Sequence, residues 1–321
     1  MGMATVALML IGVIIYPCVC GKEFSDHQEI KIQTLLKRLN KHALISIKTV
    51  DGDIIDCVPI HSQPAFDHPL LRNHTIQYAI MNSMQGKYVG TKFEVNMWKP
   101  EVQVPNEFRL AQTWLVSGVG TTRNTIEAGL QVYPGKYGDN NLRLFVFWTA
   151  NGYQGTGCYN NECAGFVQRS NKIAVGGTYN TFSQYDGDQY ELSVLIWKDG
   201  ENWWLQIGEE FVGYWPGQLF NSLGNGATIV QWGGEIVNRE TDGKHTGTDM
   251  GSGHFAEEGY KKASYFRNLM TIDETNTLRE PQGVYRTTGH DNCYNIKAGD
   301  GGTSWGVNFF YGGPGLNERC P

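Results

Sequence analysis

The sequence has little charge and no run of charges of one sign. Only 18% of its 321 residues are Asp, Glu, Lys or Arg, and the formal net charge is −6. A nucleic-acid-binding surface requires clustered Lys and Arg side chains, and the sequence contains no such cluster. We therefore expect no nucleic-acid partner.

Metal and cofactor motifs are also missing. No Cys-x-x-Cys or His-x-x-x-His pair supplies tight ligand spacing, and His245, His254 and His290 have no zinc-like spacing. Gly118-Val-Gly120 lacks the strand–helix context of a dinucleotide loop, and Gly251-Ser252-Gly253 is a turn-like stretch, not a nucleophile elbow. We expect no metal and no cofactor, and we interpret the three histidines as loop or hydrogen-bonding residues.

Long hydrophobic runs are absent except at the N-terminus. Residues 4–16 are apolar and are followed by Pro17 and the small-residue stretch Cys18-Val19-Cys20. A transmembrane anchor is the alternative, but this run is too short to span ~30 Å of hydrocarbon. The pattern predicts a signal peptide over residues 1–20. We therefore expect a secreted protein that has no membrane contact after cleavage.

Glycine and aromatic residues are abundant. The chain has 40 Gly, 16 Tyr and 9 Trp, with turn signals at short intervals. This composition favours an all-β sandwich or barrel, and no stretch after residue 41 has a long helical pattern. We predict an antiparallel, jelly-roll-like β-sandwich as the main domain.

A small α+β unit is expected ahead of this domain. Residues 23–41 carry an approximate apolar helical stripe, and Asp51-Gly52 predicts a hairpin turn between two short strands. A Pro- and His-bearing segment at 61–74 is typical of a docked linker. The predicted boundaries are 21–78 for this unit and 79–321 for the main domain.

Apolar runs locate strands in the main domain. The continuous run 142–149 predicts a central strand, and Asp199-Gly200 predicts a hairpin between the runs that flank it. Further strands are expected at 227–237 and 305–311. Residues 260–268 predict either a short strand or a helical turn.

One strand presents a polar face that carries a glutamate. Residues 125–132 alternate, so that Ile, Ala, Leu and Val occupy one face. Because strand side chains alternate between faces, Glu127, Gln131 and Tyr133 occupy the other face.

A second strand repeats this arrangement. In residues 229–236, the apolar face leaves Gln231, Gly233 and Glu235 on the opposite face. If both polar faces line one groove, Glu127 and Glu235 meet over a floor that glycine keeps bare.

Paired carboxyls can activate a water molecule. Two carboxyls held close together cannot both ionise, so one pKa rises and the pair shares a proton. The ionised member then accepts a proton from water, and the protonated member donates to the substrate oxygen. Gln131 and Gln231 are candidates to orient the carboxyls or the oxyanion. A strand Glu commonly faces solvent or pairs with Lys, so alternation alone leaves the role of Glu127 and Glu235 open.

Cysteine usage fits an oxidising compartment. Seven cysteines become five once residues 1–20 are removed. A bond between Cys158 and Cys163 would close a local loop, and one between Cys293 and Cys320 would tie down the last segment, leaving Cys57 odd. Asn73-His74-Thr75 is an N-glycosylation sequon.

Several long motifs resemble one known family. Thr-Ile-Glu-Ala-Gly around Glu127, Trp-Gly-Gly-Glu-Ile around Glu235 and the segment Met250–Gly259 are similar to the neprosin family of plant secreted glutamic peptidases. The sequence Asp-Cys-Val-Pro-Ile-His-Ser-Gln-Pro-Ala-Phe-Asp-His-Pro-Leu-Leu resembles the activation domain of that family. The resemblance covers nearly the whole chain after the signal peptide.

The resemblance implies a β-sandwich peptidase that is made as a zymogen, is active at acid pH and cleaves peptide or protein substrates after proline. It places the two catalytic glutamates on Glu127 and Glu235. It also implies the disulfides Cys158–Cys163 and Cys293–Cys320. Leu130 stands where many members have Trp, which puts the substrate preference in question more than the chemistry.

The linker prolines suggest self-activation. Pro59, Pro64 and Pro69 lie where an enzyme with a post-proline preference would remove its own leader. Their alternative role is to hold the linker extended. Two other functions remain open on the residues alone: a two-carboxylate glycoside hydrolase, with carboxyls ~5–9.5 Å apart and an aromatic sugar platform, and a noncatalytic secreted cell-wall or carbohydrate-binding protein.

Overall fold

The structure is a computed structural model that describes residues 45–48, 54–57, 75–239, 244–300 and 304–321. The predicted signal peptide, the helix at 23–41, the Asp51-Gly52 turn, the linker prolines and Asn73 lie outside these residues. In the described ranges, no helix has the length and apolar character that crossing a bilayer requires.

The chain divides into two units, Met1–Arg72 and Asn73–Pro321. In the first unit, β1 (Ile45–Lys48) pairs antiparallel with β2 (Ile54–Cys57), as the predicted hairpin requires. The division lies before β3 (Thr75–Ser83), which is a continuous strand of the second unit. The expected boundary at residue 78 would cut through β3.

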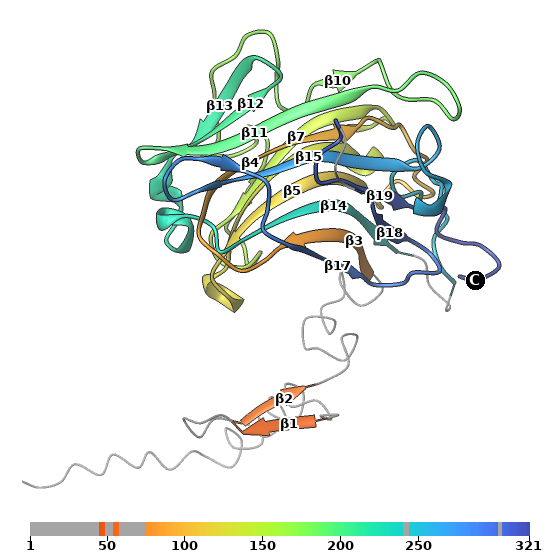
Figure 1. Ribbon diagram of the computed structural model, residues 1–321, viewed down its shortest axis with the longest axis horizontal. Helices are drawn as coiled ribbons and strands as arrows, with labels where there is room; N and C mark the ends of the chain where they lie inside the picture. Colours follow the sequence, from red (N-terminus) through yellow and green to blue (C-terminus); the bar gives the residue numbers. More distant parts are fainter. Residues whose placement is uncertain (1–44, 49–53, 58–74, 240–243, 301–303) are drawn as a thin grey trace, which may run out of the picture. The chain divides into compact units, whose positions relative to one another are not determined.

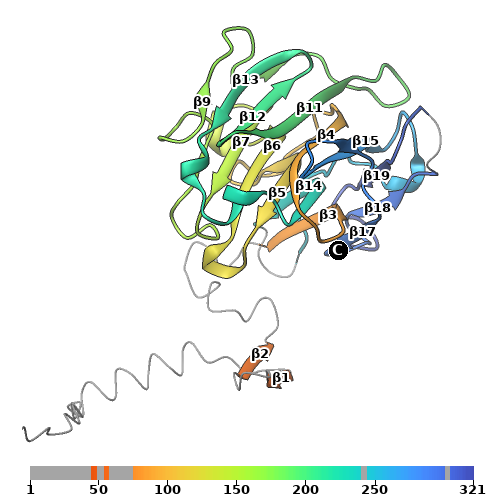
Figure 2. The same ribbon diagram turned by 60° about the vertical axis from the view of Figure 1, so that its left-hand side comes forward.

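The second unit is a sandwich of two antiparallel sheets (Figures 1 and 2). The first sheet has the order β10-β7-β6-β5-β14-β3-β17, with β8 also beside β7. Besides β3, its strands are β5 (Arg109–Ser117), β6 (Asn124–Val132), β7 (Leu142–Thr149), β8 (Cys158–Tyr159), β10 (Thr178–Tyr179), β14 (Ile229–Asn238) and β17 (Val284–Thr288).

The second sheet has the order β18-β19-β15-β4-β11-β12-β13-β9, with β16 beside β15. Its strands are β4 (Tyr88–Asn96), β9 (Val167–Gln168), β11 (Glu191–Asp199), β12 (Asn202–Ile207), β13 (Glu210–Trp215), β15 (Ser264–Asp273), β16 (Leu278–Arg279), β18 (Asn295–Ala298) and β19 (Phe309–Gly312). Short helices lie in the connections: α2 (Pro134–Tyr137) and 3-10 turns at Gly120–Thr122, Gly217–Leu219, Ser222–Asn225 and Ala256–Glu258.

The hydrophobic core lies between the two sheets. The apolar faces of β6 and β14 contribute Ile126, Leu130 and Trp232, each fully buried, and the second sheet contributes Trp203 and Trp215. Burying one large apolar side chain stabilises the fold by about 1.5–3 kcal/mol. This energy determines which side chains of β6 and β14 face the core. The polar faces of β6 and β14 therefore point out of the sandwich.

Three local predictions need correction. The run 142–149 forms β7, but β7 is not central, since beyond β6 it meets only the two-residue strands β8 and β10. Phe147 lies on the outer face of β7, where its ring packs on Tyr159 with the ring centroids 4.8 Å apart. The hairpin predicted around Asp199-Gly200 is confirmed, but its two turn residues are Gly200 and Glu201, since Asp199 pairs with Asn202. The predicted strand at 305–311 begins only at Phe309.

Both predicted disulfides are confirmed, Cys158–Cys163 and Cys293–Cys320. The second closes a loop with a sequence separation of 27 residues. In the chain-entropy account, closing a loop of that length contributes about 3–4 kcal/mol by restricting the unfolded chain. It ties the C-terminal segment to the residues that precede β18.

Candidate active site

Strand register brings the two glutamates to the same surface. Glu127 on β6 pairs with Trp114 on β5, and Glu235 on β14 pairs with Leu110 on β5. Directly paired residues share a face, and Trp114 and Leu110 are four positions apart on one strand, so they also share a face. Glu127 and Glu235 therefore project from the outer face of the first sheet, with β5 between them.

Gln112 lies between the two glutamates on β5. It pairs with Gly129 on β6 and with Gly233 on β14, so neither directly paired residue has a side chain. A Cβ at Gly129 would lie 2.6 Å from the Cα of Gln112, which leaves no room for a side chain. The fully buried Gln112 donates from Nε2 to Oε2 of Glu127 at 3.2 Å. The two glycines thus keep side chains of the flanking strands away from this amide.

Three side chains hold the Glu127 carboxyl. Thr125 Oγ1 and Tyr153 OH donate to Oε1 at 2.8 and 2.7 Å, and Gln112 donates to Oε2. Burial raises the pKa of Glu127, and the three hydrogen bonds oppose that rise because they favour the ionised form. Glu127 is therefore the member of the pair that ionises more readily.

Glu235 is in a different environment. Its side chain is buried, and within the described part of the chain no hydrogen bond reaches its carboxyl. Burial raises its pKa well above the ordinary value, and the negative charge of Glu127 raises it further. The charge of an ionised Glu127 therefore favours the protonated form of Glu235.

Phenols surround the pair. Burial, together with the charges of Glu127 and Glu235, raises the pKa of Tyr78, Tyr153 and Tyr159, so all three are neutral hydrogen-bond donors. Tyr153 adopts φ 66°, a left-handed conformation that is uncommon for residues other than glycine. This conformation accompanies the hydrogen bond from its hydroxyl to Glu127.

A cavity of about 540 Å³ adjoins these residues on the same face of the first sheet. Tyr78, Trp114, Thr125 and Tyr153 form part of its wall, and so does Gln231. Its volume is in the range of ligand sites. Glu127 and Glu235 are not part of this wall, but Thr125 and Tyr153, which donate to Glu127, are, and so is Tyr78, which pairs with Glu235. A substrate segment bound here would lie against these side chains.

Of the three candidate cleft residues, Gln231, Gln131 and Tyr133, only Gln231 lines the cavity. Gln231 lines the cavity and donates to Asn82 Oδ1 at 2.6 Å. Gln131 is fully buried and accepts from Tyr137 OH at 3.0 Å, and Tyr133 packs on Phe108 with ring centroids 5.2 Å apart. Neither Gln131 nor Tyr133 is part of the cavity wall.

Leu130 lies on the opposite face of β6 from Glu127, so it cannot contact a substrate bound beside Glu127. It is fully buried on the apolar face of β6, within the core between the sheets. The face that carries Glu127 is the opposite one. This departure from the family pattern therefore lies in the core and not on the face that carries Glu127.

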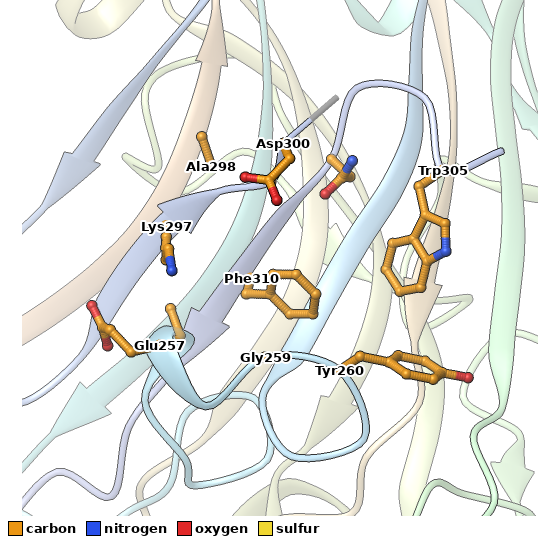
Figure 3. Close-up of a pocket in the computed structure, with 11 residues that line it drawn as sticks. Glu257, Gly259, Tyr260, Lys297, Ala298, Asp300, Trp305 and Phe310 are labelled. Atoms are coloured by element: carbon orange, nitrogen blue, oxygen red, sulfur yellow. The ribbon is translucent and has the colours of Figure 1, made fainter. Parts of the chain in front are cut away.

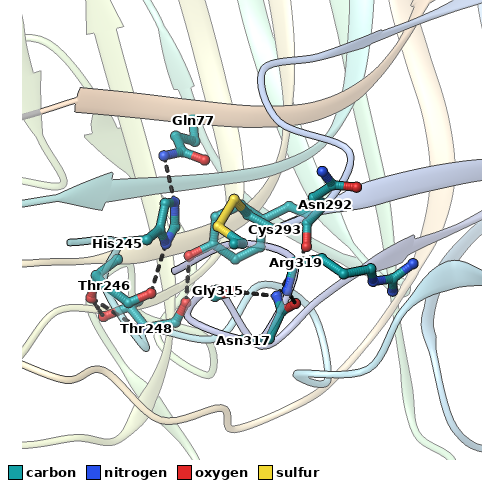
Figure 4. The surroundings of a disulfide bond; sticks show 11 residues. Gln77, His245, Thr246, Thr248, Asn292, Cys293, Gly315, Asn317 and Arg319 are labelled. Atoms are coloured by element: carbon teal, nitrogen blue, oxygen red, sulfur yellow. Dashed lines mark hydrogen bonds between the residues drawn. A yellow bond between two sulfur atoms is a disulfide. The ribbon is translucent and has the colours of Figure 1, made fainter. Parts of the chain in front are cut away.

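The histidines behave as hydrogen-bonding residues where they are buried. His245 contacts Gln77 Nε2 at 2.6 Å and the Thr246 carbonyl oxygen at 2.8 Å (Figure 4). Its ring lies near the sulfurs of Cys293 and Cys320, but those sulfurs form a disulfide and are not available as thiolate ligands. His254 pairs with Glu258 at 3.0 Å.

Sequence reasoning missed Gln112, Thr125 and the phenols of Tyr78, Tyr153 and Tyr159. Thr125 had a usable signal, because it lies two residues before Glu127 on the same strand and so shares its face. The others come from strands and a loop whose register with β6 and β14 is set by tertiary pairing. No local pattern in the sequence indicates that register.

These features define a class: a β-sandwich with two buried carboxyls of unequal proton affinity on the outer face of one sheet, as in hydrolytic sites that activate water. The sequence model of the family described as Neprosin matches residues 105–314, and that of the Neprosin activation peptide matches residues 46–128. The chain therefore belongs to the neprosin family.

The chain also shows limited similarity to solved structures. Scytalido-glutamic peptidase with a transition state analog inhibitor is 9% identical and has a TM-score of 0.39, over 74% of this chain and 98% of that one. The same peptidase with a peptide-based analog gives a TM-score of 0.36 at 9% identity, over 74% and 96%. CG-16, a homodimeric agglutinin from chicken liver, gives 0.23 at 10% identity, over 51% and 90%. The family assignment depends on the two family models alone.

Proposed function

We propose that this protein is a secreted glutamic endopeptidase that is made as a zymogen and cleaves peptide bonds after proline. Membership of the neprosin family, with its activation peptide, supports a glutamic-type peptidase. The observation that carries the mechanism is the unequal environment of two buried carboxyls on one face: Glu127 has three hydrogen-bond donors and Glu235 has none in the described residues.

In this proposal Glu127 is the base and Glu235 is the acid. Ionised Glu127 accepts a proton from water as the water oxygen bonds to the scissile carbonyl carbon, and Glu235 donates its proton to the carbonyl oxygen. When the intermediate collapses, the proton on Glu127 passes to the leaving nitrogen and the C–N bond breaks. The hydroxyl proton returns to Glu235, so both carboxyls regain their starting states.

Gln112 and the phenols position the reacting groups. Gln112 holds Oε2 of Glu127 from the strand between the two acids, and Tyr153 holds Oε1 from the loop after β7. Because these donors are fixed before substrate binds, they need not reorganise during the reaction. The mechanism as proposed uses side chains of this chain only.

Peptide hydrolysis tests the proposal. The activated protein is incubated at acid pH with a peptide that contains one proline and with a matched peptide in which alanine replaces it, and the products are identified by mass spectrometry. We expect cleavage after proline and much slower cleavage of the alanine peptide. Turnover of a polysaccharide with both peptides intact would instead support the glycoside hydrolase, and no turnover of any substrate would support the noncatalytic alternative.

Removing one hydroxyl should move the pH profile. Activity requires ionised Glu127 and protonated Glu235, so it falls on the acid side as Glu127 gains a proton and on the basic side as Glu235 loses one. The Tyr153 hydrogen bond lowers the pKa of Glu127. Tyr153→Phe should therefore raise that pKa and move the acid limb upward by about one pH unit, since hydrogen bonds to charged groups contribute about 1.5–3 kcal/mol.

The matched control for this measurement is Tyr285→Phe, because Tyr285 lines the same cavity and its hydroxyl makes no bond to Glu127. The control should keep the wild-type profile of kcat against pH. An unchanged acid limb in Tyr153→Phe would show that this phenol does not tune Glu127.

Secretion belongs to the same proposal. The two disulfides are typical of an oxidising compartment, and the N-terminal pattern at residues 1–20 predicts the route. The sequon at Asn73 would place a glycan next to the division between the two units. Peptides and proteins rich in proline are the proposed substrates.

A further inference from the structure

A second cavity lies outside the carboxyl site. It measures about 490 Å³ and is formed by the turn before β15, by β18 and by β19 together with the residues that precede it (Figure 3). Its wall consists of Ala256, Glu257, Gly259, Tyr260, Lys297, Ala298, Gly299, Asp300, Trp305, Asn308 and Phe310. None of these residues belongs to the wall of the cavity beside the glutamates.

Alternation places this cavity on the other side of the sandwich. Phe309 and Tyr311 on β19 are buried in the core, so Phe310 between them points outward from the second sheet. Phe310 pairs with Lys297 on β18 and with Tyr265 on β15, which share that outer face. Glu127 points outward from the first sheet. A ligand here would not occupy the peptide cleft.

Three aromatic rings shape the cavity. Figure 3 shows the Phe310 ring between Lys297 and Glu257 on one side and Trp305 and Tyr260 on the other. The Tyr260 and Trp305 rings are 5.3 Å apart at 89°, and the Trp305 and Phe310 rings are 5.9 Å apart at 33°. Tyr260 is 50% exposed. Exposed rings at a cavity wall offer flat apolar faces on which a ligand can stack.

Polar groups surround the rings. Asn295 Nδ2 donates to Oε2 of Glu257 at 2.6 Å, which fixes that carboxylate at the rim. Among the described residues, no hydrogen bond or ion pair engages the side chain of Lys297 or of Asp300. The cavity thus combines stacking surfaces with two carboxylates that accept hydrogen bonds and one ammonium group that donates them.

This combination selects the class of ligand. A proline-rich peptide would stack on the rings, but a polyproline II segment offers carbonyl acceptors and few donors, which leaves Glu257 and Asp300 unmatched. A sugar has C–H faces that stack and hydroxyls that both donate and accept, so it matches the rings, the carboxylates and Lys297 together. We propose that this cavity is a binding site for a neutral oligosaccharide, separate from the peptidase site.

Calorimetry on the full secreted protein tests this inference, with cellohexaose, xylohexaose and mannohexaose as probes. We expect saturable binding of at least one hexaose. Tyr260→Ala and Glu257→Gln should each weaken it about tenfold or more, which corresponds to the loss of one stacking contact or charged hydrogen bond. Phe211→Ala, an equally exposed aromatic on β13, is the matched control and should bind as wild type.

The same variants separate this site from the proposed peptidase function. Tyr260→Ala and Glu257→Gln should retain wild-type peptide cleavage, and Glu235→Gln should retain wild-type oligosaccharide binding. No binding of any hexaose at millimolar concentration, or binding that both cavity variants leave unchanged, would overturn the inference. Binding of decaproline in place of the hexaoses, lost in Tyr260→Ala, would also overturn it and would assign the cavity to peptides.

Discussion

Replacing Glu235 with Gln should lower kcat for peptide cleavage by about 10³-fold or more, and replacing Glu127 should do the same. Positioned acid and base groups each contribute about 10²–10⁴-fold, and in this mechanism loss of either one blocks both proton transfers. The readout is the initial rate on the proline-containing peptide with activated protein, and active-site changes are separated from unfolding by the thermal midpoint of each variant.

The two replacements differ in how far they change stability as well as activity. The Glu235 carboxyl makes no hydrogen bond within the described residues, so Gln at this position removes the ionisable proton and little else. Glu127 accepts from three donors, and the amide nitrogen of a Gln would meet one of them as a second donor. We therefore expect Glu127→Gln to lose some stability as well as activity.

Glu209→Gln is the matched control, because Glu209 is an exposed carboxylate in the turn between β12 and β13. It should retain wild-type kcat and thermal stability. Wild-type rates in Glu235→Gln would remove that residue from the mechanism, and wild-type rates in Glu127→Gln would do the same for the proposed base.

Incubation of the precursor at acid pH should release a leader that ends within residues 59–69, and peptidase activity should appear with it. A cut there falls within the first unit and ahead of β3, which begins at Thr75. Because β3 pairs with β14 along the strand that carries Glu235, the mature sheet must keep β3. N-terminal sequencing of the mature protein locates the cut.

Self-processing makes a stricter prediction. Precursor that carries Glu235→Gln should stay intact on its own and should be cut when wild-type enzyme is added. Replacing Pro59, Pro64 and Pro69 with Ala should slow release of the leader, and the thermal midpoint should not change. An intact precursor that already cleaves peptide at the full rate would contradict the zymogen proposal.

The sequence was sufficient to predict the fold class and the face that each glutamate occupies. Strand alternation has a period of two, and a shift by one residue would move Ile126 and Trp232 out of the core. The burial energy of such side chains is large, so a local pattern is enough to orient Glu127 and Glu235. The sequence does not show that the two polar faces belong to the same sheet. The structure shows this, because β5 pairs with both β6 and β14.

What could not be predicted depends on contacts between distant segments. Gln112 is a functional candidate only because β5 lies between β6 and β14 and because two glycines flank it there. Tyr153 reaches Glu127 from a loop through a left-handed backbone conformation. The run 142–149 suggests a central strand because it is continuously apolar and aromatic. Its outward-facing Phe147 packs on Tyr159, and this contact does not require a long strand on each side of β7.

The central claim is that the two carboxyls on the outer face of the first sheet hold different protonation states, and carbon-13 NMR of labelled glutamate side chains measures this directly. Titration of the Cδ signals, assigned with Glu127→Gln and Glu235→Gln, gives the order in which the protons leave. We predict that Glu127 ionises first and that Glu235 stays protonated well above the ordinary glutamate range of about 4.3. Joint ionisation of both carboxyls near that value, or earlier ionisation of Glu235, would contradict the account.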